Sequence, residues 1–101
     1  MTLPNGYELQ STFWQDFSVA DFFGANAVKD TFNRAFNEWK TNHVYLTELV
    51  VVLNWKIWQH YEKNGSCELS MLYNKLWEQA DIYARENLKN EELNFFLRIT
   101  D

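Results

Sequence analysis

The sequence predicts an all-α protein that folds as a compact antiparallel bundle of four main helices plus a short C-terminal helix. Three observations favour this class. Apolar residues recur every three to four positions over long stretches, which is the helical period. Glycine (three) and proline (one) are scarce among the 101 residues, whereas an all-β domain needs many turns. The links between the periodic stretches are short, which favours antiparallel neighbours.

Residues 1–11 are expected to form an extended N-terminal arm ahead of a single helical domain, residues 12–101. The arm contains a turn signal, Pro4-Asn5-Gly6. Proline suits the second position of a turn, and glycine supplies a positive φ.

The first helix is predicted over about residues 12–23. Thr12 is a suitable N-cap, and Gly24 stands where a glycine commonly ends a helix. Three apolar residues share one face at helical spacing: Phe13, Phe17 and Ala20.

The second helix is predicted over about residues 27–40, with Asn26 as its N-cap. Its apolar residues form one narrow stripe, and the opposite face is polar. The stripe consists of Val28, Phe32, Ala35, Phe36 and Trp39.

The third helix, about residues 44–63, is expected to be central because it is apolar on two sides. One apolar stripe consists of Leu46, Leu49, Val50, Leu53, Ile57 and Tyr61. The second consists of Val44, Val51, Trp55 and Trp58. Only a narrow polar sector remains for solvent: Glu48, Lys56, Gln59 and Lys63.

Two further helices complete the bundle. Ser66 is the predicted N-cap of a fourth helix, about residues 67–88, which carries a broad apolar face. Asn90, followed by two glutamates in the first turn, begins a short last helix that ends near residue 99.

The charge pattern argues against several partners. The net charge is −5, from 14 acidic and 9 basic residues, and the bases form no run that could neutralise phosphates. Direct binding to nucleic acid or to anionic membranes is therefore disfavoured. No apolar stretch approaches the roughly 18 residues of a membrane span. The N-terminus lacks the pattern of a signal peptide, so a cytoplasmic location is expected.

The sequence contains no complete catalytic or metal-binding motif, which predicts a non-enzymatic protein without a cofactor or a metal. His60-Tyr61-Glu62 matches half of the zinc-deaminase signature, but the paired cysteines are missing, because Cys67 is the only one. His43 and His60 are too far apart to share a metal. We interpret both histidines as ordinary polar residues.

Cys67 and the aspartates of the first two helices are two smaller candidates. Cys67 lies in the first turn of a helix, where the dipole favours the thiolate, so it is a candidate reactive thiol. Asp16 and Asp21 diverge by about 140° around their helix. These two residues and Asp30 are therefore expected to be solvated or to cap helices rather than to hold a metal.

The surplus of aromatic residues (18%) points to a protein interface. Several large apolar side chains lie off the predicted core stripes, and such residues concentrate at interfaces. The candidate partner surface consists of Trp14, Val51, Trp55 and Trp58. The alternative is that another helix of the same chain covers Trp55 and Trp58.

The sequence carries a resemblance in three segments: Thr12–Phe17, Asp30–Phe36 and Leu46–Asn54. Through them the chain resembles small uncharacterised helical proteins encoded on bacterial mobile elements, namely plasmids, conjugative elements or prophages. The resemblance covers most of the chain from about Thr12 onward. It implies mobile-element cargo and assigns no activity to any residue.

The function that these observations favour is protein binding, as an adaptor or as a small inhibitor, with self-association as a further form. Two alternatives belong to other classes. An acidic DNA mimic would need carboxylates spaced like phosphates. A small-ligand-binding helical bundle would need a pocket of roughly 300 Å³ or more.

Overall fold

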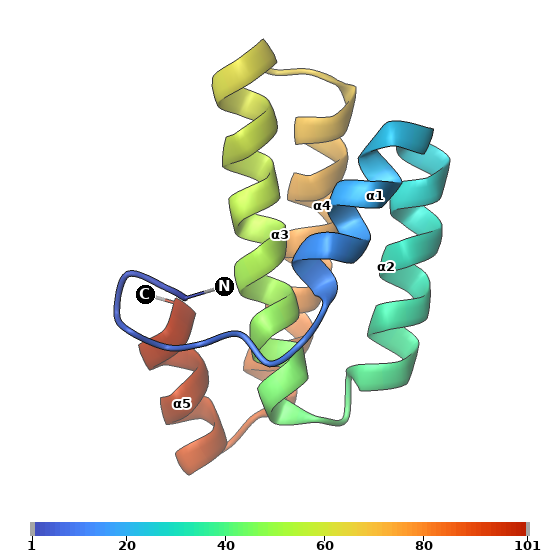
Figure 1. The fold of residues 1–101 in the computed structure, drawn as a ribbon. Coiled ribbons are helices and arrows are strands. Elements are labelled where there is room, and N and C mark those ends of the chain that lie inside the picture. Colours follow the sequence, from blue (N-terminus) through green and yellow to red (C-terminus); the bar gives the residue numbers. More distant parts are fainter. Residues whose placement is uncertain (1, 101) are drawn as a thin grey trace.

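The computed structural model describes residues 2–100, and it confirms the all-α bundle (Figure 1). Five helices follow one another along these residues: α1 (Phe13–Phe23), α2 (Ala25–Trp39), α3 (His43–Asn64), α4 (Glu68–Asn87) and α5 (Glu91–Thr100). Each predicted helix is present, with ends that differ by no more than two residues. Residue 1 of the predicted arm and residue 101 of the predicted domain lie outside the described range.

The caps of two helices differ from those that the sequence suggested. Gly24, not Asn26, precedes α2, and its φ of 98° explains why glycine stands at this sharp connection between α1 and α2. Cys67, not Ser66, caps α4. The Ser70 hydroxyl accepts from the Cys67 N–H at 2.9 Å, and the Cys67 Sγ accepts from the Ser70 N–H at 3.5 Å. This reciprocal pair is a capping box in which a thiol replaces the usual hydroxyl.

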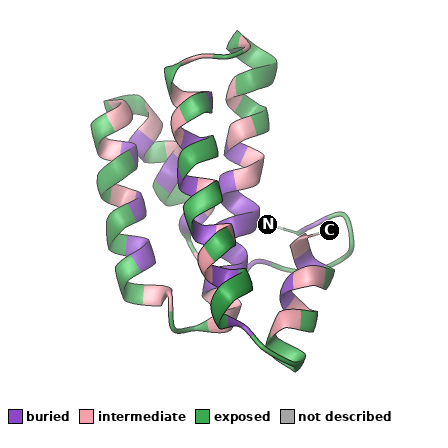
Figure 2. Cartoon of the chain, turned by 180° about the vertical axis from the view of Figure 1, so that it is seen from behind, coloured by how far each residue is buried: buried purple, intermediate pink, exposed green. Residues whose placement is uncertain are grey.

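Helix α3 is central, as its two apolar stripes predicted. It contacts each of the other four helices, and every residue from Leu46 to Leu53 is buried. Figure 2 shows the buried residues on the inner sides of the helices and the exposed residues on the outside.

The predicted polar sector of α3 is only half correct. Gln59 and Lys63 are exposed, but Glu48 and Lys56 are fully buried. The arm covers Glu48 and donates hydrogen bonds to it, whereas Asp21 of α1 pairs with Lys56. Both charges are thus buried with partners, as buried charges in proteins usually are.

The arm is packed against the bundle rather than simply extended. Its predicted turn is present, with the Gly6 N–H donating to the Leu3 carbonyl at 2.9 Å. Leu3 and Leu9 are buried in the common core. In Figure 1 the arm crosses in front of α3 and reaches the C-terminal end of α5.

Candidate functional site

The four residues of the predicted partner surface do not form one exposed face. Trp14 and Trp55 are half-buried and pack edge-to-face, with ring centroids 5.9 Å apart. Val51 is only 6% exposed. Trp58 is 55% exposed and lies against Tyr61, 5.8 Å between centroids. Trp55 is thus covered by other parts of the same chain, as the alternative interpretation expected. Of the four residues, Trp58 alone is on the surface.

The most exposed aromatic residues lie at the end of α1. Phe22 is 90% exposed and Phe23 is 77% exposed, and Val19 one turn earlier is also on the surface. Neither phenylalanine belongs to the partner surface that the sequence predicts. Tyr61, which was expected in the core, is exposed because it lies in the last turn of α3, near the end of the bundle (Figure 1).

A groove of about 770 Å³ runs between α1 and α2. Val19 and Phe23 line its α1 side, and they are neighbours on one helix face because they are four residues apart. The groove also contains small or buried apolar side chains and several charged residues. The apolar lining includes Phe13, Ala20, Ala27 and Ala35, and the charged residues are Asp16, Asp30, Arg34 and Glu38.

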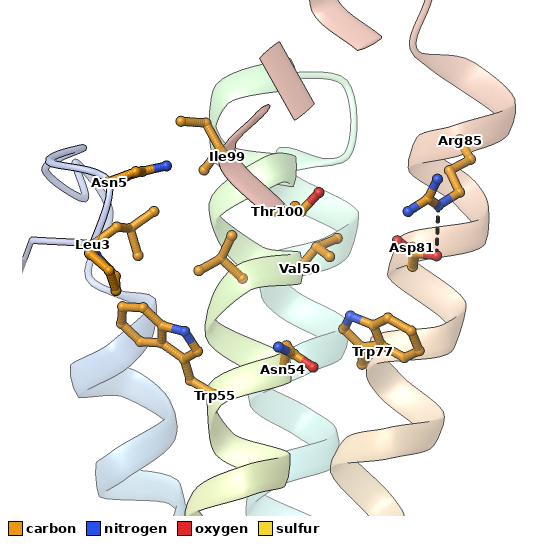
Figure 3. A pocket seen from close by; sticks show the side chains of 12 residues that line it. Leu3, Asn5, Val50, Asn54, Trp55, Trp77, Asp81, Arg85, Ile99 and Thr100 are labelled. Carbon is orange, nitrogen blue, oxygen red and sulfur yellow. Dashed lines mark hydrogen bonds and ion pairs between the residues drawn. The ribbon is translucent and has the colours of Figure 1, made fainter. Parts of the chain in front are cut away.

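A second hollow, of about 420 Å³, lies on another side of α3 (Figure 3). Its walls come from the arm, α3, α4 and α5. The lining residues are Leu3, Pro4, Asn5, Val50, Val51, Asn54, Trp55, Trp77, Asp81, Arg85, Ile99 and Thr100. We call this hollow the arm pocket. It shares no lining residue with the α1–α2 groove.

A buried polar network connects α1, α3 and α4. The Lys56 Nζ is 2.5 Å from the Asp21 Oδ2, and the His60 Nε2 is 3.0 Å from the same oxygen. The Tyr73 hydroxyl donates to the Asp21 Oδ1 at 2.6 Å. The Lys56 Nζ also lies 5.0 Å from the ring centroid of Trp14, within cation–π range.

The predicted roles of Asp21 and His60 therefore need correction. Asp21 is not on a solvated face, and it is the shared acceptor of the network. His60 is largely buried, and its ring stacks on Tyr73 with centroids 5.4 Å apart. Neither the α1–α2 groove nor the arm pocket is lined by these residues, and the network connects three helices.

His43, Asp16, Asp30 and Cys67 lie in the surroundings that the sequence predicted. His43 pairs with Glu92 at 3.1 Å, and Asp16 and Asp30 are exposed. The backbone N–H of Ser70 donates to the Cys67 sulfur and lowers the pKa of the thiol. A lowered pKa is also what the position of Cys67 at the start of a helix predicted. The thiol caps α4 and lines neither the α1–α2 groove nor the arm pocket.

Two tyrosines provide a test of these buried contacts at high pH. Burial raises the pKa of Tyr7 and of Tyr73 above the ordinary 10.0, and the Glu48 and Asp21 carboxylates that accept their hydroxyl protons act in the same direction. Because the folded pKa is the higher one, the stability from these phenols is fully present below about pH 10 and is lost as the pH rises further. We expect cooperative alkaline unfolding together with phenolate absorbance at 295 nm.

Single Tyr7→Phe and Tyr73→Phe variants should each lose part of that late absorbance change, and their unfolding should begin at a higher pH. A phenolate signal from both residues while near-ultraviolet circular dichroism stays native would contradict the buried contacts.

Among residues 2–100, no helix is long and apolar enough to cross a membrane. Within the same range, no three His, Cys, Asp or Glu side chains are grouped so that they could hold a metal ion. Comparison of the chain with protein-family models, with curated proteins and with solved structures finds no match.

Proposed function

We propose that this chain is a non-enzymatic protein-binding module of the cytoplasm, acting as an adaptor or a small inhibitor, and that the α1–α2 groove is its interface. The observation that carries the proposal is the exposure of Val19 and Phe23 along this groove. Large apolar side chains cost free energy in water, and clusters of them mark surfaces that become covered. The aromatic surplus of the sequence supports the same function.

The shape of the groove favours a helical partner. It lies between two roughly antiparallel helices, and α2 has 15 residues, which corresponds to about 22 Å at 1.5 Å per residue. Its lining includes the small residues Ala20, Ala27 and Ala35, which allow close approach of a backbone. An amphipathic helix binds such a groove through its apolar face.

The charges along the groove favour a basic partner. Asp16, Asp30 and Glu38 face one base, Arg34, so the groove carries a net negative charge. Complementary charges steer association and select partners. A second copy of this chain is less suited, since its own net charge is −5. The partner that we propose is therefore a protein that presents a basic amphipathic helix.

A fluorescence anisotropy titration tests this proposal with a labelled peptide of leucine and lysine in a helical pattern, about five turns long. The matched probe is the same peptide with glutamate in place of lysine. We expect the lysine peptide to bind with a Kd of about 10 μM and the glutamate peptide to bind at least tenfold more weakly. Raising the salt from about 0.05 to about 0.5 M should weaken binding of the lysine peptide.

Variants locate the binding. Phe23→Ser should weaken binding of the lysine peptide about tenfold, because it removes an apolar contact. Ile82→Ser is the matched control, since Ile82 is also exposed but lies on α4 outside the groove. Equal binding of the two peptides, or equal effects of the two substitutions, would argue against this interface. A concentration-dependent dimer in light scattering that Phe23→Ser abolishes would assign the groove to a second copy instead.

The acidic DNA mimic is the weaker alternative. A DNA mimic needs carboxylates on its surface, but Glu48 is buried and Asp21 is largely buried. Arg34 also lies among the acidic residues of the groove. The mobile-element origin that the resemblance implies stays a prediction, and it is compatible with an inhibitor of a host protein.

A further inference from the structure

We propose that the arm pocket is a binding site for a small aromatic carboxylate. With a volume of about 420 Å³, it falls within the usual range for small-molecule sites, about 300–1,000 Å³. Such sites combine apolar walls with a few convergent polar groups. The arm pocket has both, from segments that are far apart in the sequence.

Several polar groups of the pocket are hydrogen-bond donors that have no protein partner among residues 2–100. In Figure 3, Asn54 lies between Trp55 and Trp77, and both indole nitrogens are turned toward it. Within the part of the chain that the structure describes, neither indole N–H and no atom of the Asn54 side-chain amide has a hydrogen-bond partner. An indole nitrogen can only donate, and the Asn54 amide can donate through its NH₂ group, so the two indoles are matched by a ligand that accepts.

Arg85 adds a guanidinium to this donor set, and the Asp81 carboxylate beside it also lines the pocket. The Arg85 Nε donates to the Asp81 Oδ2 at 3.0 Å, and the dashed line in Figure 3 marks this pair. The guanidinium carbon lies 5.5 Å from the centroid of the Phe96 ring, and the terminal nitrogens make no hydrogen bond to the described residues. A guanidinium binds a carboxylate through two parallel hydrogen bonds. The head group that fits best is therefore a carboxylate.

The rest of the lining favours a ring. Leu3, Val50, Val51 and Ile99 provide apolar surface from the arm, α3 and α5. The indole edges, which carry the positive end of the ring quadrupole, point inward and favour the face of a second aromatic ring or an anion. One ring with a short acid side chain satisfies the donors and the apolar wall together.

Titration of ¹⁵N-labelled protein tests this site through the five indole N–H signals. The probe is phenylacetate, and its matched probes are phenylacetamide, which is neutral, and phenethylammonium, which is cationic. We expect phenylacetate to move the Trp55 and Trp77 signals along a saturable curve below about 10 mM. Phenylacetamide should bind roughly fivefold more weakly, and phenethylammonium should not saturate.

Arg85→Gln should abolish the preference for the carboxylate over the amide, with the fold checked by the dispersion of the remaining signals. Trp77→Phe keeps an aromatic side chain but removes the indole N–H donor. It should weaken phenylacetate binding about fivefold. Arg34→Gln is the matched control because Arg34 lies in the α1–α2 groove, so it should change nothing. No saturable shift of Trp55 and Trp77, or an unchanged preference in Arg85→Gln, would overturn the proposal. The result is independent of peptide binding, because the two sites share no residue.

Discussion

Replacing Asp21 by asparagine is expected to lower the free energy of unfolding by about 3 kcal/mol, although the side chain keeps its size. The change removes the negative charge that lies 2.5 Å from the Nζ of Lys56, and Lys56 is fully buried. A buried charge that loses its partner keeps its desolvation cost without the compensating attraction. For a domain with a total stability of about 5–15 kcal/mol, this loss is a large fraction.

Urea denaturation at neutral pH measures the effect, and two further variants isolate its cause. Asp16→Asn makes the same chemical change on the same helix, but Asp16 is exposed, so the expected loss is within about 0.5 kcal/mol. Lys56→Met combined with Asp21→Asn removes both charges and should recover much of the stability, since an apolar side chain of similar length replaces the lysine. Equal stabilities of Asp21→Asn and Asp16→Asn would contradict the role given to the network.

Helical periodicity predicted the helices, whereas the caps depended on local geometry that composition does not reveal. The stripe from Val28 to Trp39 repeats at the helical period and needs no tertiary information, so it predicted α2 well. The sharp connection at Gly24 needs a positive φ, and nothing in the neighbouring residues distinguishes it from a simple helix end followed by an Asn26 cap. Cys67 was missed as a cap because serine is the more usual residue there.

Burial of polar residues could not be predicted because it depends on residues that are distant in the sequence. Lys56 and Glu48 occupy the only polar sector of α3, which in an isolated helix would face water. Their partners, Asp21 and the arm, are more than 30 residues away. The same limit applies to the candidate sites. Trp55 lies on an apolar stripe that the sequence predicts to bind a partner. In the fold, Trp55 instead packs against Trp14 and lines the arm pocket.

Replacing Glu48 by glutamine is expected to cost about 2–3 kcal/mol of stability and to loosen the arm. Both carboxylate oxygens act as acceptors. The Oε1 accepts from the backbone N–H of Gln10 at 2.9 Å and of Ser11 at 2.8 Å, and the Oε2 accepts from the Tyr7 hydroxyl at 2.7 Å. A glutamine offers one oxygen only, so its NH₂ group must face one of these donors. If the NH₂ group faces Tyr7, the hydroxyl must turn round and accept from it; if it faces the backbone, one N–H loses its partner. In either orientation the hydrogen bonds to a charged carboxylate, which are the stronger kind, are lost.

The consequence of this substitution extends to the arm pocket, because Leu3 and Asn5 of the arm form one of its walls. Hydrogen exchange of the arm amides should accelerate in Glu48→Gln, and phenylacetate binding should weaken with it. Tyr7→Phe is the graded control: it removes one of the donors and leaves the two backbone contacts, so about 1 kcal/mol and a docked arm are expected. If arm exchange stays slow in Glu48→Gln, then Leu3 and Leu9 hold the arm by apolar burial alone, and Glu48 is not its anchor.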